Sequence, residues 1–225
     1  MAAQPARLKR FYTLLVVLGL AGAVLIGMLM QRKPVSIPAN VVVQPADTAG
    51  FRGYIMGRPD APVEVTEYGD YQCPACAGFD MVQFPTVKER LVDGGRIRWR
   101  YRDFPLDNIH PNARLTAHAA ACADEQGKYW QVHALLFQGQ PDWSSGNAER
   151  IIRGYAEAAS LDMARYAECM ESARYAGRIQ ASYEQGVALG VGGTPQFLIG
   201  GRIYDGMSYD AMRKLVDSLA ALPRQ

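Results

Sequence analysis

The 225-residue chain lacks several features that would place it in a class at once. It has only four cysteines, too few for a scaffold held together mainly by disulfides, and it has no internal repeats or low-complexity tracts. Its net charge is only +2, and residues 51–225 carry a net charge of −2, so we expect no nucleic-acid partner held through many phosphate contacts. Charged residues make up only 20% of the chain and apolar residues 49%, which excludes wholesale disorder and provides for a hydrophobic core.

Charged side chains are also missing from residues 11–30. About 20 apolar residues in a helix span the hydrocarbon core of a bilayer, so this run predicts a transmembrane helix or an uncleaved signal anchor. Three basic residues precede the run and two follow it, which favours a short cytoplasmic N-terminus at residues 1–10 and a single pass through the cell membrane. A cleaved signal peptide is the alternative, because Ala21-Gly22-Ala23 resembles a cleavage site.

Residues 31–50 connect this run to the rest of the chain. They carry Pro34, Pro38 and Pro45 and few large side chains, which predicts an extended tether. Both alternatives for the N-terminus place the remaining residues on the extracytoplasmic side, periplasmic or outer, where disulfides persist.

The order of strand and helix patterns after residue 50 predicts an α/β fold with an all-helical insertion. Alternating side chains indicate strands, and apolar residues three and four apart indicate helices. The expected elements are a strand at 63–68, a helix at about 73–92 bent at Pro85, a strand at 96–102, a helical block at about 107–190, a hairpin at 196–206 and a last helix capped by Ser208.

Two cysteines three residues apart, Cys73 and Cys76, stand where the first strand passes into the helix. This spacing brings the two sulfurs close enough to bond, and the first sulfur faces unpaired backbone N–H groups at the positive helix end. Those groups stabilise a thiolate, so we expect Cys73 to attack and Cys76 to resolve the mixed disulfide. Such a redox pair needs no dissociable cofactor.

A zinc or copper site is the alternative for this pair. A structural zinc site needs a second pair of ligands, and the sequence has no second C-x-x-C motif. His118 and Cys122, four residues apart on a probable helix, would supply half a site at most. We therefore expect no metal, and we expect His110, His118 and His133 to be ordinary hydrogen-bonded residues.

A resemblance to a known family is carried by residues 65–76, which read VTEYGDYQCPAC. This segment is similar to the active-site segment of the DsbA-like thiol–disulfide oxidoreductases, which have a thioredoxin fold. Two further segments fit that family: FPL at 104–106 with HP at 110–111, and VGGTPQF at 191–197. The resemblance covers about residues 51–222 and implies that residues 51–225 form a DsbA-like thioredoxin domain.

The resemblance implies roles for three further residues. Pro195 is expected to form a cis peptide bond beside the active-site sulfurs, which leaves the backbone of Thr194 free to bind an extended substrate. An ordinary trans proline at the start of a strand is the alternative. Glu67 is expected to assist proton transfer at the buried sulfur, if its strand face is the core face; in another register it would reach solvent.

The other two cysteines, Cys122 and Cys169, lie on apolar faces of two helices in the insertion. An oxidising compartment favours a structural disulfide between them. The alternative is two buried, unpaired thiols that act as small apolar residues.

Together these features predict a membrane-anchored, extracytoplasmic thiol–disulfide oxidoreductase. We expect it to form disulfides in cysteine-containing exported proteins and to be reoxidised by a quinone-linked membrane partner. A reductase or isomerase with the same pair, or a non-catalytic metallochaperone or chaperone on the same fold, are the alternatives. Ala75 stands where strongly oxidising relatives commonly carry a histidine, so the expected reduction potential lies between the values of about −270 mV for thioredoxin and about −120 mV for DsbA.

Overall fold

A computed structural model describes residues 4–30 and 34–221, and these fall into two units, Met1–Pro34 and Val35–Gln225. In the first unit, helix α1 (Gln4–Met30) forms over the predicted anchor. Across the part of the chain that the structure describes, no helix is both long and apolar enough to cross a membrane. Residues 1–3 of the predicted cytoplasmic N-terminus and residues 31–33 of the predicted tether lie outside the described residues.

The described part of the predicted tether runs along the second unit. The backbone N–H of Val35 donates to Glu149 Oε2 (3.1 Å), and that of Asn40 donates to Gln180 Oε1 (3.2 Å). A short helix, α2 (Pro45–Thr48), interrupts the extended backbone and contacts α10 (Ala176–Ala188). The predicted extended tether therefore contains one short helix within residues 34–50.

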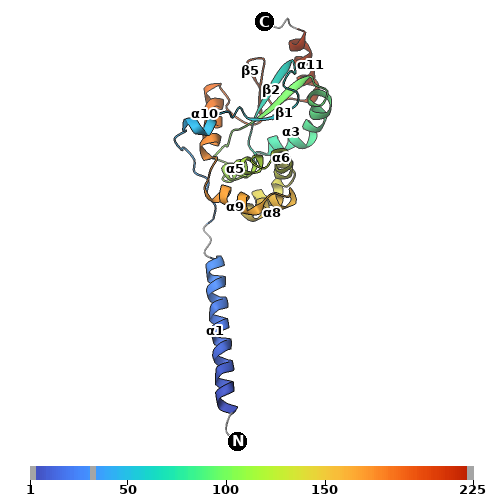
Figure 1. The fold of residues 1–225 in the computed structure, drawn as a ribbon. Helices are drawn as coiled ribbons and strands as arrows, with labels where there is room; N and C mark the ends of the chain where they lie inside the picture. Colours follow the sequence, from blue (N-terminus) through green and yellow to red (C-terminus); the bar gives the residue numbers. More distant parts are fainter. Residues whose placement is uncertain (1–3, 31–33, 222–225) are drawn as a thin grey trace. The chain divides into compact units, whose positions relative to one another are not determined.

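Five strands form the central sheet in the order β1-β3-β2-β4-β5 (Figure 1). The innermost strand, β2, runs parallel to β3 and antiparallel to β4, and Glu67 on it lies opposite Tyr101 and Phe197. The strands are β1 (Tyr54–Met56), β2 (Val63–Gly69), β3 (Ile97–Asp103), β4 (Gln196–Ile199) and β5 (Arg202–Asp205). The sequence patterns missed β1, because three residues are too few to show an alternation.

One face of the sheet is covered by the helical segments that connect β2 to β3 and by the helix that follows β5. Val65, Trp99 and Phe197 are fully buried there, against α3 (Pro74–Val82), α4 (Phe84–Val87), a π-helical turn η1 (Lys88–Val92) and α11 (Tyr209–Ala220). The predicted long helix is thus divided into three pieces. Proline cannot donate a backbone hydrogen bond, which explains why α4 begins as a new helix at Phe84-Pro85.

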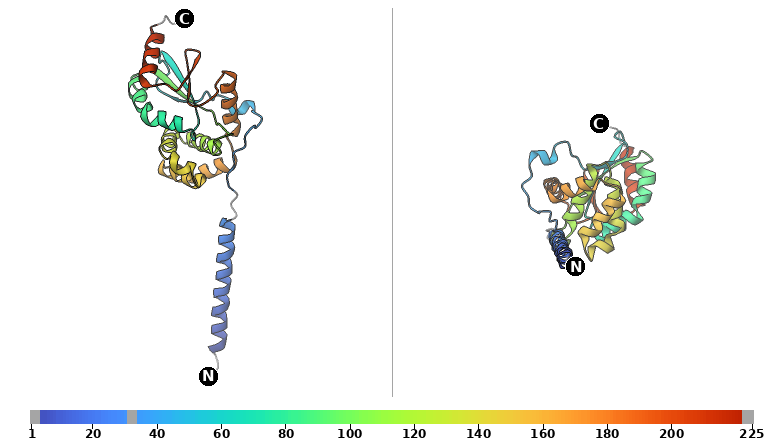
Figure 2. Two further views of the ribbon diagram at one scale, coloured as in Figure 1. Left: turned by 180° about the vertical axis from the view of Figure 1, so that it is seen from behind. Right: turned by 60° about the horizontal axis from the view of Figure 1, so that its bottom comes forward.

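The helical insertion gathers at one end of the sheet, and α10 covers the face opposite α3 and α11 (Figures 1 and 2). Trp143, Leu136 and Ile152 form part of its buried core. Its helices are α5 (Ala113–Asp124), α6 (Tyr129–Gln138), α7 (Gln140–Ser144), α8 (Ala148–Ala158) and α9 (Met163–Glu171), followed by α10. The predicted thioredoxin-like α/β fold with a helical insertion is confirmed.

Candidate active site

The turn after β2 places Cys73 at the start of α3. The backbone N–H of Cys73 donates to the carbonyl of Asp70 (3.0 Å), and the carbonyl of Cys73 accepts from Ala77 (3.1 Å), the first helical bond. Cys73 is the N-cap residue in extended conformation (φ −72°, ψ 120°), and Pro74 occupies the first helical turn, where its missing N–H is not needed. The Cys73 sulfur therefore lies at the positive end of the helix, and Cys76 lies one turn further along.

The two active-site cysteines are free thiols that differ in exposure. Cys73 is 7% exposed and Cys76 is 0% exposed. Cys73 is less accessible than its place at a helix start suggests, because the loop before β4 lies against it: its Sγ is 3.3 Å from the carbonyl oxygen of Thr194.

The surroundings separate the pKa values of the two thiols. The pKa of Cys73 falls to about 5, chiefly because the Cys76 thiol donates to its sulfur; the Thr194 side chain and the backbone N–H groups of Cys76 and Ala75 add to this, against the effect of burial. Burial raises the pKa of Cys76 well above its usual value, and the neighbouring Cys73 and Glu67 raise it further. The pair thus favours a thiolate on Cys73 and a thiol on Cys76.

The loop before β4 brings a cis peptide bond between Thr194 and Pro195 to this thiolate. The Thr194 hydroxyl is buried and has no hydrogen-bond partner of normal geometry among the described residues, yet this side chain lowers the pKa of Cys73. A hydroxyl that rotates toward the Cys73 sulfur accounts for both observations, since a thiolate accepts a hydrogen bond better than a thiol.

Of the two registers considered for Glu67, the structure shows the core-facing one: the side chain is only 3% exposed, and the charges of Glu67 and of the two thiols act on one another. Burial raises the pKa of Glu67 well above its usual value, and the charges of Asp80 and Cys73 raise it further. Its Oε1 has no hydrogen-bond partner within the described part of the chain. A protonated carboxyl next to a buried thiol is suited to exchanging a proton with it.

The sequence patterns did not identify a connected set of polar side chains, which begins at Asp80, whose charge acts on Glu67. Asp80 Oδ1 is 3.7 Å from His133 Nε2, and His133 Nδ1 is hydrogen-bonded to the Tyr71 hydroxyl (2.8 Å), which also bonds Tyr129 (2.8 Å). Asp80 stands four residues after Cys76, a spacing that puts both on one helix face and could have identified it. His133 comes from α6, and no local pattern indicates its contact with α3.

The insertion also holds the active-site turn in place. The amide of Gln140, on α7, donates to the carbonyls of Tyr71 (2.6 Å) and Cys73 (3.0 Å). Asp70 Oδ2 accepts from the backbone N–H of Leu106 (2.9 Å) and pairs with His110 Nδ1 (2.8 Å). These bonds join the turn to the start and to the middle of the helical block and hold the Cys73 backbone in the N-cap conformation.

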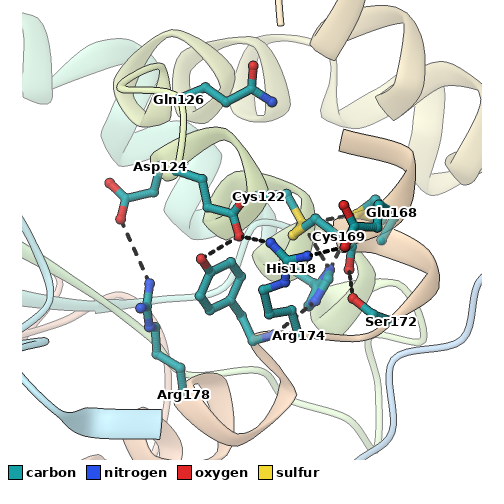
Figure 3. Close-up of a disulfide and its surroundings, with 12 residues drawn as sticks. His118, Cys122, Asp124, Gln126, Glu168, Cys169, Ser172, Arg174 and Arg178 are labelled. Atoms are coloured by element: carbon teal, nitrogen blue, oxygen red, sulfur yellow. Dashed lines mark hydrogen bonds and ion pairs between the residues drawn. A yellow bond between two sulfur atoms is a disulfide. The ribbon is translucent and has the colours of Figure 1, made fainter. Parts of the chain in front are cut away.

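The second pair of cysteines forms a disulfide between α5 and α9 (Figure 3). Cys122 and Cys169 are both 0% exposed. His118 Nδ1 lies 3.5 Å from the Cys122 sulfur and 3.3 Å from the Met170 sulfur, while its Nε2 accepts from the backbone N–H of Tyr175 (3.1 Å). Burial lowers the pKa of His118 to about 4, so the imidazole is neutral at neutral pH.

This arrangement shows whether His118 and Cys122 could form part of a zinc site. His118, Cys122 and Cys169 bring their ligand atoms within 4.8 Å of one another, the one such group found in the described ranges. The two sulfurs are bonded to each other and are not thiolates, so in this form the group offers no zinc site.

Comparison with known proteins agrees with this geometry. The thioredoxin family pattern matches residues 51–218. A Na(+)/H(+) antiporter NhaA 3 of Salinispora tropica is 37% identical over 155 residues, which are 69% of this chain but 22% of the antiporter, so the chain spans about a fifth of such relatives. A probable disulfide bond formation protein D of Bacillus anthracis is 24% identical over 72% of this chain and 76% of that protein.

Solved structures share the fold. BdbD from Bacillus subtilis superposes with a TM-score of 0.67 at 22% identity, over 80% of this chain and 97% of that one. A thioredoxin-like oxidoreductase from Silicibacter pomeroyi gives a TM-score of 0.65 at 26% identity, over 80% of this chain and all of that one (100%). With the matched family pattern, the fold and the Cys73–Cys76 pair, the chain belongs to the thioredoxin family.

Proposed function

We propose that this protein is a DsbA-like thiol–disulfide oxidoreductase that forms disulfides in cysteine-containing exported proteins, through Cys73 and Cys76, on the extracytoplasmic side of the membrane. The observation that carries the proposal is the separation of the two pKa values, to about 5 for Cys73 and well above the usual value for Cys76. A stabilised thiolate favours the reduced form of the enzyme, which makes its disulfide the stronger oxidant.

In the first step, a substrate thiolate attacks the Cys73 sulfur of the Cys73–Cys76 disulfide. The bond between the two enzyme sulfurs breaks, and its electron pair goes to Cys76. Attack at Cys73 is favoured because Cys76 is fully buried, whereas Cys73 retains some exposure. Glu67, whose raised pKa favours the protonated form, gives the proton that converts the buried Cys76 thiolate into a thiol.

In the second step, another thiolate of the substrate attacks the substrate sulfur of the mixed disulfide, and Cys73 leaves as a thiolate. The substrate has then lost two electrons, which reside on the reduced Cys73–Cys76 pair. A low pKa makes Cys73 a good leaving group, so product release is fast. A quinone-linked membrane partner accepts the two electrons and restores the disulfide.

Thr194 and Pro195 hold the substrate next to the reacting sulfurs. The Thr194 carbonyl lies 3.3 Å from the Cys73 sulfur, so a peptide that pairs with the Thr194 backbone would present its cysteine at Cys73. Binding through the backbone accepts many sequences, which suits an enzyme acting on varied unfolded proteins.

The N-terminal segment serves as the anchor. Large apolar side chains of α1 are exposed along the described stretch, among them Leu14 (62%), Leu18 (59%) and Leu20 (62%). Lipid would cover them if residues 11–30 span the membrane, with residues 1–10 in the cytoplasm and residues 31–50 leading to the catalytic domain. We expect the protein to resist carbonate extraction, whereas a soluble product that begins near Val24 would identify a cleaved signal peptide.

Trapping of mixed disulfides in cells tests the assignment of the two cysteines. Cys76→Ala leaves Cys73 without its resolving thiol, so we expect it to accumulate covalent complexes with substrates and with the reoxidising partner. The double variant Cys73→Ala/Cys76→Ala is the matched control. Equal capture by both variants would contradict the role of Cys73.

The direction of the reaction is read from the redox state of the pair in intact cells, by thiol labelling after acid quench. An oxidase is found mostly as the Cys73–Cys76 disulfide, and it becomes reduced when the quinone-linked partner is deleted. A pair that is mostly reduced whether or not that partner is present identifies a reductase or isomerase. Metal bound stoichiometrically to the purified protein would identify a metallochaperone.

A further inference from the structure

A cavity of about 230 Å³ lies on the face of the sheet opposite α3. Its walls come from the segment that includes α2, from β3 and from α10, and they include Thr48, Phe51, Arg52, Arg100, Arg102 and Gln185. Because side chains alternate along a strand, Arg100 and Arg102 point away from the face on which Trp99 and Tyr101 pack. None of these wall residues belongs to the candidate active site.

Arg102 is the least ordinary residue of this cavity. It is 7% exposed, its Nε has no hydrogen-bond partner, and no carboxylate lies within ion-pair distance of it in the ranges that the structure describes. A buried guanidinium without an ion-pair partner is costly. Burial accordingly lowers the pKa of Arg102, although an arginine stays charged at neutral pH.

The acidic groups near the cavity do not offset its positive charge. Glu64 Oε2 accepts from Arg100 Nη2 (2.7 Å) but is shared with Arg98 Nε (2.8 Å), and the Nε of Arg100 has no partner in the described part of the chain. Asp103 follows Arg102 in β3 and therefore points to the other face, so its charge acts on Arg102 without forming an ion pair, and burial raises the pKa of Asp103 to about 7. Among the residues that the structure describes, three guanidinium groups thus line the cavity and no carboxylate does.

Tight packing against the segment just before β1 fixes the positions of Arg100 and Arg102. Gly53 packs directly on them: a Cβ at this position would lie 2.7 Å from Arg100 Cγ and 2.9 Å from Arg102 Cδ. Phe51 adds an aromatic face, with the Arg102 guanidinium 5.7 Å and that of Arg178 4.2 Å from its ring centre. The side chains therefore need little ordering before they bind a ligand.

We propose that this cavity binds a phosphate group, as inorganic phosphate or as a phosphate monoester. Guanidinium groups bind phosphate oxygens through paired N–H donors, and a doubly charged anion supplies the directly bonded ion-pair partner that Arg102 lacks. Arg52 at the exposed rim and the amide of Gln185 provide further donors.

The test uses the full-length protein in a non-ionic detergent. Thermal unfolding is followed in sodium phosphate, in glycerol 3-phosphate and in sodium chloride at equal ionic strength, and calorimetric titration gives the affinities. We expect phosphate to raise Tm above the chloride value. A response to both phosphates identifies the phosphate group of a larger molecule as ligand, and a response to inorganic phosphate alone identifies the free ion; both support the site.

Three variants decide whether the cavity is responsible. Arg102→Gln should weaken phosphate binding at least tenfold while leaving Tm in chloride equal or higher, because it removes a buried unpaired charge. Arg52→Gln, at the rim, should weaken binding severalfold and serves if Arg102→Gln fails to fold. Arg153→Gln, which removes the same charge from an exposed pair with Glu157 on α8, should bind as the wild type does. Equal Tm in phosphate and chloride, or equal responses of all variants, would overturn the site.

Discussion

Two cysteine pairs lie in one domain, and their surroundings give them opposite chemistry. Cys73 and Cys76 are free thiols at a helix start, where hydrogen-bond donors converge on Cys73 and lower its pKa to about 5. Cys122 and Cys169, 47 residues apart, are bonded to each other and wholly buried, next to the neutral His118. Partial access and stabilisation of the thiolate, rather than any property of sulfur itself, distinguish a reactive pair from an inert one.

The largest effect should come from removing the attacking sulfur. Cys73→Ala should reduce thiol–disulfide exchange to the background rate, because the buried Cys76 cannot be reached by a substrate. Insulin reduction and oxidation of a dithiol peptide measure this. Cys122→Ala with Cys169→Ala is the matched control and should keep nearly full activity; a comparable loss in that variant would show that the two pairs are not separate in function.

The insertion pair should matter for stability instead. Loss of the Cys122–Cys169 bond should lower the free energy of unfolding by about 2–4 kcal/mol, because the unfolded chain regains the freedom of a long loop. Denaturant unfolding of the double alanine variant gives the value. An unchanged midpoint would mean that the bond adds nothing to the packing of α5 on α9.

Replacing the buried acid should slow the steps that involve Cys76. Glu67→Gln keeps the shape but cannot exchange a proton, so we expect the step in which a substrate thiolate attacks Cys73 and releases Cys76 to slow by about 10–100-fold. Stopped-flow reduction of the Cys73–Cys76 disulfide measures this rate. An unchanged rate across the pH range would remove Glu67 from the mechanism.

The same variant predicts a change in how stability depends on pH. The folded pKa of Glu67 is raised above its unfolded value of about 4.5, so wild-type folding takes up a proton above that pH, and stability is lost as the pH rises toward the folded pKa. Glu67→Gln removes this loss. The free energy of unfolding of the variant minus that of the wild type should therefore be larger at pH 8 than at pH 4. Denaturant unfolding of both proteins at the two pH values measures this difference.

A smaller effect is expected from the hydroxyl beside the thiolate. Thr194→Val should raise the pKa of Cys73 above its value of about 5, because the hydroxyl can no longer donate to the thiolate. Thr194→Ser keeps the hydroxyl and should leave the pKa unchanged. Alkylation rate against pH measures both, and identical profiles would show that backbone N–H groups and Cys76 act alone.

A feature could be predicted from the sequence where its residues lie close together in the chain, and could not where distant segments meet. The position of Cys73 at a helix start depends on local spacing and was found from the sequence. The same spacing left two registers open for Glu67, one facing the core and one facing solvent. Gln140 and His133 reach the site from the helical block, so only the folded chain shows them there. The arginine cavity is of the same kind: the alternation of β3 reveals a basic strand face, but not which segments enclose it.

The most direct test is one redox titration that reports on both pairs. The protein is equilibrated in thiol buffers of defined potential, alkylated, and analysed by peptide mass spectrometry. We predict that Cys73–Cys76 is half reduced between about −270 and −120 mV, while Cys122–Cys169 stays oxidised until below about −300 mV, as buried structural disulfides do. Reduction of both pairs at one potential, or of Cys122–Cys169 first, would contradict the account.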